Sequence, residues 1–183
     1  MANNCMTDVT ILGPENQIEK LYSIMEKLDR EKKPSDGWSY GNTWLGNIIS
    51  ALGGNPDVIY CRGYFFELAR RDNNSLEFSC DSAWSEPHEF FDFLRNVLPE
   101  IDIYFYAEEC GCDYYVTNDA TGCFYSQRFI VMDEEIETVY LDTEEQLLDC
   151  ARKWWGLDCE DFGKLANEVA DSETRSVIRI EVV

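Results

Sequence analysis

Basic residues are scarce in this chain of 183 residues, which has 15 lysines and arginines against 36 acids and a net charge of −21. The shortage is uneven: residues 1–74 hold 10 acids and 8 bases, whereas residues 75–183 hold 26 acids and 7 bases. Proteins bind nucleic acids and anionic membranes largely through lysines and arginines, so direct contact with either is not expected. The natural partner for this negative charge is a basic protein surface. The alternative is that the acids only keep the protein soluble.

Long apolar segments are also missing. No segment is apolar over the length needed to cross a bilayer, and residues 1–10 lack the basic start and apolar run of a signal peptide. We therefore expect a soluble, cytoplasmic protein. The 45% hydrophobic fraction, with 14% aromatic residues, predicts a folded domain with a filled core despite the charge.

The cysteine spacing of structural zinc sites, Cys-x2-Cys, does not occur among the eight cysteines. Cys110, Cys112 and Cys123 come closest to a ligand set, and the single histidine, His88, lies elsewhere in the sequence. We predict no metal and no cofactor, and we keep these three cysteines as the candidates should a metal bind. Acidic neighbours raise a thiol pKa, so we expect unreactive, reduced thiols.

Catalytic signatures are likewise missing. No nucleophile elbow surrounds a serine, no glycine-rich phosphate loop follows a strand, and the many carboxylates single out no pair that would flank a cleft. His88 has no sequence partner and reads as a helix-start residue. We therefore predict no catalytic residue, and we favour a non-enzymatic protein.

The hydrophobic patterns that are present predict an α+β fold. Residues 5–12 alternate as a strand, and a helical stripe follows Gly13-Pro14. Two strands over 62–69 and 75–80, a helix from the N-cap Ser85 to Leu98, and a strand over 101–108 complete the order β-α-β-β-α-β. This order predicts a ferredoxin-like split βαβ sheet over residues 1–108, with two helices on one face. Residues 30–37 resemble a linker, and an inserted helix is expected at about 38–54, centred on 43–52.

Residues 109–183 are predicted to form an acidic extension that packs on the same domain. Its expected elements are a hairpin of residues 114–118 and 123–132, a helix with a capping box between Thr143 and Gln146, a second helix over 157–170 and a last strand over 177–183.

One stretch is similar to a known family. The segment "LEFSCDSAWSEPHEFFDFLRNVLPEIDIYFYAEECG" and the opening "MANNCMTDVTILGP" resemble the phage- and plasmid-encoded family typified by the plasmid protein YubB. The resemblance covers about residues 1–115 and implies a ferredoxin-like domain and an origin in a mobile element. It implies no activity, and the "WSYGNTW" segment departs from the longer tryptophan-rich region of that family.

Two groups of residues are candidates for binding a partner. If the inward side chains of the strands pack under the helices, alternation places acids and tyrosines together on the opposite sheet face, and tyrosines are common interface anchors. Continued alternation would add Cys110 and Cys112 to that face, and the extension could instead cover it. The second group is a run of seven acids without a base, which could mimic nucleic-acid phosphates or be ordinary solvated surface. The candidates are Glu77, Asp102, Tyr104, Tyr106 and Glu108 on the sheet, and Asp133, Glu134, Glu135, Glu137, Asp142, Glu144 and Glu145 in the run.

These features favour a non-enzymatic, acidic interaction protein from a phage or mobile element. Its expected partner is a basic, nucleic-acid-handling host protein, for example a defence nuclease that it would inhibit in the manner of an anti-CRISPR protein. The alternatives are a cysteine-based metal-binding or redox-responsive protein and a self-assembling accessory protein. The sequence leaves the oligomeric state open.

Overall fold

Five helices and two sheets make up the part of the chain that the computed structural model describes, residues 4–30 and 40–183. The predicted α+β class is confirmed. The chain divides into two compact units, unit 1 over residues 1–114 and unit 2 over residues 115–183.

The strands of unit 1 form an antiparallel arrangement in the order β2-β3-β1-β4. Because each neighbouring pair is antiparallel, β1 and β2 run in the same direction with β3 between them. The elements are β1 (Asn4–Leu12), α1 (Glu15–Arg30), α2 (Leu45–Ala51), β2 (Gly63–Asp72), β3 (Ser75–Ala83), α3 (His88–Val97) and β4 (Asp102–Glu109).

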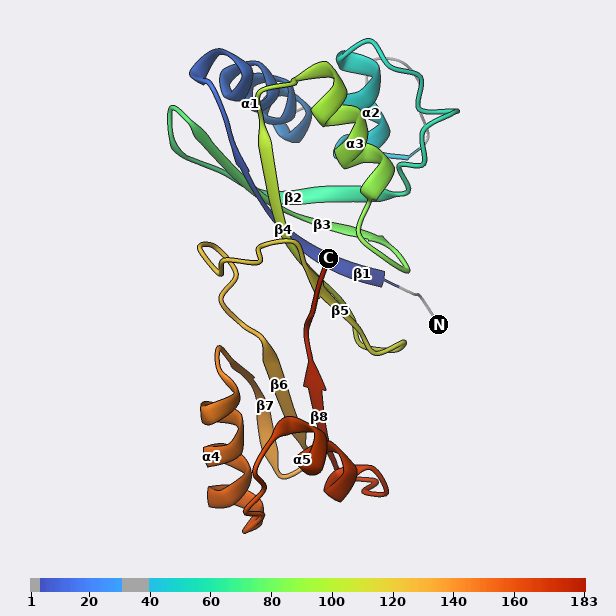
Figure 1. The fold of residues 1–183 in the computed structure, drawn as a ribbon. Coiled ribbons are helices and arrows are strands. Elements are labelled where there is room, and N and C mark those ends of the chain that lie inside the picture. The colour runs from blue at the N-terminus through green and yellow to red at the C-terminus, as the bar shows by residue number, and fades with distance from the viewer. Residues whose placement is uncertain (1–3, 31–39) are drawn as a thin grey trace. The chain divides into compact units, whose positions relative to one another are not determined.

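The core of unit 1 lies between this sheet and its three helices, which Figure 1 shows on one side of the strands. Alternation along β1 buries Cys5, Thr7, Val9 and Ile11 on this side, as the sequence predicts. The helices bury the stripes expected from their spacing. These buried side chains are Ile18, Leu21 and Met25 from α1, Ile48 and Ile49 from α2, and Phe90, Phe91 and Leu94 from α3.

Local details of unit 1 differ from the sequence prediction. Strand β2 extends to Asp72 through a bulge between Phe66 and Ala69, where Glu67 adopts a φ of 53°. Such a bulge adds a residue that strict alternation cannot anticipate. Ser85 is not the N-cap of α3, because the helix begins at His88 and its N-cap position is occupied by Pro87 without a side-chain cap. The predicted linker lies, except for Arg30, outside the described residues.

Unit 2 has its own core, built between a three-stranded antiparallel sheet and two helices. The sheet order is β7-β6-β8, and the buried cluster is Phe129, Val131, Leu147, Ala151, Leu165 and Val169. The predicted capping box is present, with Gln146 N donating to Thr143 Oγ1 at 3.2 Å. The elements are β5 (Tyr114–Thr117, which begins at the boundary), β6 (Phe129–Asp133), β7 (Ile136–Leu141), α4 (Glu144–Trp155), α5 (Phe162–Val169), β8 (Arg175–Arg179) and β9 (Glu181–Val182).

The predicted hairpin of residues 114–118 and 123–132 is wrong. Strand β5 pairs in parallel with β9, and β6 pairs with β7 and β8 instead. The intervening chain is a tight loop because its backbone amides bond to the buried carboxylate of Asp119 rather than to a partner strand. Strand β7 was missed, since Glu137 and the acids that precede the strand read as one charged surface, and the last strand is divided at the buried Ile180. The helix predicted over 157–170 begins only at Phe162, after the N-cap Asp161.

Candidate functional site

The face of the unit 1 sheet opposite the helices gathers the predicted acids and tyrosines on three adjacent strands. The register sets Thr10 between Glu77 and Tyr104. Asp8 lies between Ser79 and Tyr106 in the next row, and the other two rows add Asp81, Glu108 and Asp102 in the same way. We call this surface the acidic sheet face; its members are Asp8, Glu77, Asp81, Asp102, Tyr104, Tyr106 and Glu108. It brings together the five residues of this face that the sequence named as candidates for binding a partner.

Hydrogen bonds fix several side chains of the acidic sheet face. Ser79 donates to Asp8 Oδ1 at 2.6 Å, and the Tyr106 hydroxyl donates to Glu108 Oε2 at 2.8 Å. Glu77 forms an ion pair at 2.7 Å with Arg71 from the edge strand β2. Strands β1, β3 and β4 contain no lysine or arginine of their own. The face therefore combines negative charge with phenol rings, a chemistry suited to binding cationic groups.

The acidic run of residues 133–146 is divided by the fold of unit 2. Asp133 has a side chain that is only 7% exposed; it accepts from Trp155 Nε1 at 2.6 Å and contacts Arg175 at 3.4 Å. Glu144 accepts from the backbone amide of Phe162 at 2.6 Å, and so ties α4 to the start of α5. These two carboxylates have structural roles inside the unit. The exposed members of the run are Glu134, Glu135, Asp142 and Glu145, and the side chain of Glu137 lies outside what is described.

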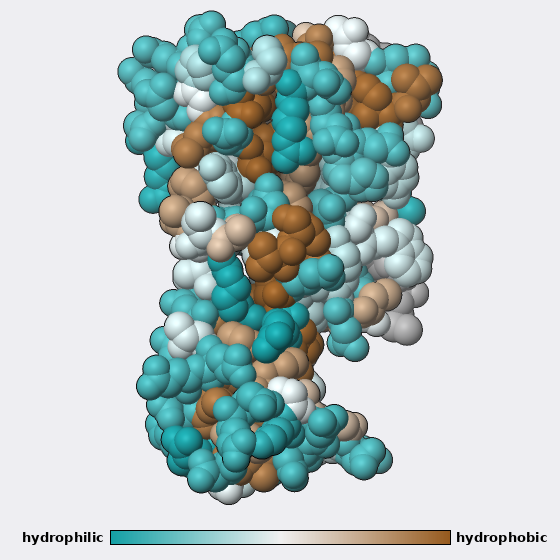
Figure 2. Space-filling view, viewed as in Figure 1, coloured by the Kyte–Doolittle hydropathy of each residue, from teal (hydrophilic) through white to brown (hydrophobic). Residues whose placement is uncertain are grey.

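The exposed members leave a mainly hydrophilic surface. In the view of Figure 2 hydrophilic residues cover most of the visible face of each unit. Asp142 accepts from Ser126 Oγ at 2.8 Å, and Asp133 accepts from the amide of Glu135 at 2.8 Å, where the chain turns between β6 and β7. The run therefore spans the turn between β6 and β7, strand β7 and the start of α4, and two of its seven acids, Asp133 and Glu144, are bound within the unit.

The candidate thiols do not continue the acidic sheet face. Strand β4 ends at Glu109, and Cys110 and Cys112 are exposed in the turn that follows, so the alternation stops before them. Cys123 is exposed in the loop after Asp119. A hydrogen bond to the Glu109 side chain, burial and nearby negative charge raise the pKa of the Cys112 thiol, in the direction predicted. Across residues 4–30 and 40–183, no group of three or more His, Cys, Asp or Glu side chains could hold a metal ion.

Two buried acids were missed by sequence reasoning. Glu109 is 6% exposed, and its Oε2 has no hydrogen-bond partner among the described residues. Asp119 is fully buried and accepts from Thr121 Oγ1, Gly122 N, Phe124 N and Tyr125 N at 2.6–3.0 Å. Burial opposes ionisation, but these hydrogen bonds outweigh it and lower the Asp119 pKa to about 2. The Asp-Ala-Thr-Gly sequence is a turn signal that could have indicated this role.

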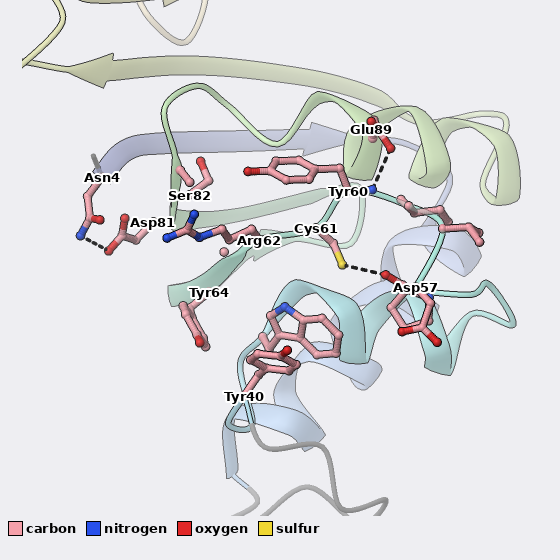
Figure 3. Close-up of a pocket in the computed structure, with 16 residues that line it drawn as sticks. Asn4, Tyr40, Asp57, Tyr60, Cys61, Arg62, Tyr64, Asp81, Ser82 and Glu89 are labelled. Atoms are coloured by element: carbon pink, nitrogen blue, oxygen red, sulfur yellow. Dashed lines mark hydrogen bonds between the residues drawn. The ribbon is translucent and has the colours of Figure 1, made fainter. Parts of the chain in front are cut away.

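A cleft in unit 1 was also missed, because its lining comes from segments far apart in the sequence. The cleft has a volume of about 930 Å³ and lies at the beginning of β2. Figure 3 shows the aromatic and acidic side chains that line it. Tyr40, Tyr60 and Tyr64 are 54%, 43% and 42% exposed, although large apolar rings are more often buried. No periodic pattern marks such a surface in the sequence.

Comparisons with protein-family models, curated proteins and solved structures found no match for this chain. None of the described helices combines the length and the apolar composition required to cross a membrane.

Proposed function

We propose that this protein is an acidic interaction protein whose acidic sheet face binds a basic, nucleic-acid-handling protein. The register that places five carboxylates and two tyrosines on neighbouring strands, without a base from those strands, is the observation that carries this proposal. Complementary charge steers such partners together, and partly buried tyrosines supply rigid contact area.

The proposal includes a ferredoxin-like arrangement for unit 1. The order β2-β3-β1-β4, the antiparallel pairing of neighbours and the two helical connections that follow β1 and β3 support it. RNA-binding domains of this topology use the open sheet for base stacking with supporting positive charge. Here the charge of the sheet has the opposite sign. The expected partner is therefore a basic protein that itself binds phosphates, and not a nucleic acid.

An origin in a phage or plasmid belongs to the same proposal and rests on the sequence resemblance to the YubB-like family. In that setting the partner would be a host protein that handles DNA or RNA, such as a defence nuclease. Inhibition would then follow from competition, because the acidic sheet face would occupy the basic groove that nucleic acid uses.

The test is a pull-down from a nuclease-treated bacterial lysate with three versions of the immobilised full chain. The first is the natural protein, and the other two each lose four negative charges. The sheet-face variant carries Asp8→Asn, Glu77→Gln, Asp102→Asn and Glu108→Gln. The matched control carries Glu15→Gln, Asp29→Asn, Asp92→Asn and Glu100→Gln, at exposed positions on or beside the helices.

We expect basic nucleic-acid-binding proteins to be retained at low salt by the natural protein and the control, and to be lost from the sheet-face variant. Raising the salt to about 1 M, where the Debye length is about 3 Å, should release them. Equal retention by the two variants would show that only net charge matters. Absence of any nucleic-acid-binding protein at low salt would contradict the proposal.

A further inference from the structure

The cleft of unit 1 is built around the first residues of β2. One side is formed by Tyr40 and Trp44, whose ring centroids lie 4.8 Å apart. Residues 56–62 form a second side, and the end of β3 contributes Asp81, Ser82 and Ala83. Figure 3 shows Tyr40, Tyr64, Tyr60 and Arg62 around the same space, with Asp57 at one end and Asp81 at the other.

Half of the exposed aromatic side chains gather in this cleft. Among the described residues six aromatic side chains are exposed, and three of them, Tyr40, Tyr60 and Tyr64, line it. The other three, Trp84, Phe124 and Tyr140, are not part of its lining. Exposed apolar side chains scattered singly need no explanation, whereas a gathered set marks a ligand or partner site. The volume of about 930 Å³ lies in the upper part of the range for ligand clefts.

The charges of the cleft favour a cation. Its lining includes Asp57, Asp81 and Glu89 against the single base Arg62. Glu89 Oε2 accepts the amide of Tyr60 at 2.7 Å and Asp81 Oδ2 accepts from Asn4 at 3.0 Å, so both carboxylates are held in place. Negative charge beside the electron-rich faces of tyrosine and tryptophan attracts guanidinium and ammonium groups.

The edge of β2 is already occupied at this point. Trp44 pairs with Tyr64 in an antiparallel bridge, and Phe65 N donates to Thr43 O at 2.9 Å. A bound segment therefore cannot add a strand to the sheet here, which is one common way of capturing an extended peptide. Recognition must act through side chains that enter the cleft.

We propose that this cleft binds an extended peptide segment of a partner protein by taking up its arginine or lysine side chains. A guanidinium or ammonium group stacks on the rings of Tyr40, Tyr60 or Tyr64, and Asp57 supplies a counter-charge. Arg62 is the one base among the described residues of the lining, and Figure 3 shows its side chain extending toward Asp81, so Asp57 at the other end is the available counter-charge. This is a second binding site, in addition to the acidic sheet face of the proposed function. The two can be tested separately, because the four substitutions of the sheet-face variant leave every residue of the cleft unchanged.

The test measures fluorescence anisotropy of fluorescein-labelled peptides titrated with the full chain. The probe is Gly-Arg-Gly-Arg-Gly, with a lysine version and a citrulline version that keeps the shape but removes the charge. A labelled single-stranded oligonucleotide tests base stacking instead. We expect the arginine and lysine peptides to bind, and the citrulline peptide and the oligonucleotide to bind at least about tenfold more weakly.

Matched substitutions separate the cleft from the overall charge. Tyr40→Ala should weaken arginine-peptide binding about fivefold, and Asp57→Asn roughly two- to fivefold. Tyr140→Ala and Asp29→Asn remove the same kinds of exposed side chain elsewhere and should change the affinity by less than about twofold. Far-ultraviolet circular dichroism checks that each variant is folded, and a cleft variant that is unfolded is replaced by Tyr60→Ala.

Four results would overturn the proposal. They are no measurable binding of the arginine peptide, equal binding of the citrulline peptide, equal losses in the cleft and control variants, and tighter binding of the oligonucleotide that depends on Tyr40. Normal peptide binding by the sheet-face variant is expected, so this site and the proposed function can fail independently.

Discussion

Replacing Asp119 should destabilise unit 2 more than any exposed acid does. The carboxylate is fully buried and accepts four hydrogen bonds, from Thr121 Oγ1 and from the amides of Gly122, Phe124 and Tyr125. Asp119→Ala leaves these donors without an acceptor, and each unsatisfied buried donor costs about 1–3 kcal/mol. Because the loop can relax toward water, we expect a total loss of about 3–5 kcal/mol. Asp119→Asn keeps one oxygen acceptor and should cost less.

The same residue predicts a pH dependence. Its pKa is lowered from the ordinary 3.8 to about 2, so the folded state favours the ionised form. This contribution is fully present above about pH 4 and disappears as the pH falls toward about 2. At about 1.4 kcal/mol for each pKa unit, it amounts to about 2 kcal/mol.

The assay is urea unfolding followed by circular dichroism at several pH values, with hydrogen exchange of residues 118–128 to localise the effect. The control is Asp171→Ala, an exposed acid of the same unit. The stability difference between the natural protein and Asp119→Asn should shrink as the pH falls from about 4 to about 2. The reasoning is refuted if Asp119→Ala unfolds at the same urea concentration as Asp171→Ala, or if the difference does not depend on pH.

Two further predictions concern a helix cap and a thiol. Thr143→Ala should lower the free energy of unfolding by about 1 kcal/mol, because it removes the acceptor for Gln146 N. Urea unfolding measures this change. A change equal to that of Asp171→Ala would contradict the prediction. Glu109→Gln should speed iodoacetamide alkylation of Cys112 at pH 8. The Glu109 side chain raises the Cys112 pKa, so its neutralisation should increase the fraction of reactive thiolate. Site-resolved mass spectrometry measures the rate, and the control Glu108→Gln should show no such gain.

The sequence predicted those elements whose signals are local. The α1 stripe of Ile18, Leu21 and Met25, the capping box at Thr143 and the alternation of β1 each depend on residues close in the chain, and all are present. Alternation along β4 also placed Tyr104 and Tyr106 on one face of the sheet and the buried Ile103 and Phe105 on the other. Periodicity suffices here because one face of each element must be buried.

Pairing and burial at a distance were not predictable in this way. Residues 114–118 and 123–132 have the pattern of a hairpin, but the parallel pairing of β5 with β9 involves residues more than 60 positions apart. The acids of residues 133–146 read as one charged surface, yet Asp133 is held by Trp155 and Arg175. Local sequence does not show which distant donor will satisfy a carboxylate.

The sequence by itself determined the α+β class, the acidic charge and the presence of acids and tyrosines on alternating positions of β3 and β4. Only the tertiary structure decided which strands lie side by side, and therefore that these residues share one surface around Asp8 and Thr10. It also decided that Asp119 is buried and that Tyr40, Tyr60 and Tyr64 meet at a cleft. The physical reason is that composition and periodicity act within one element, whereas strand pairing and burial depend on contacts between segments far apart in the chain.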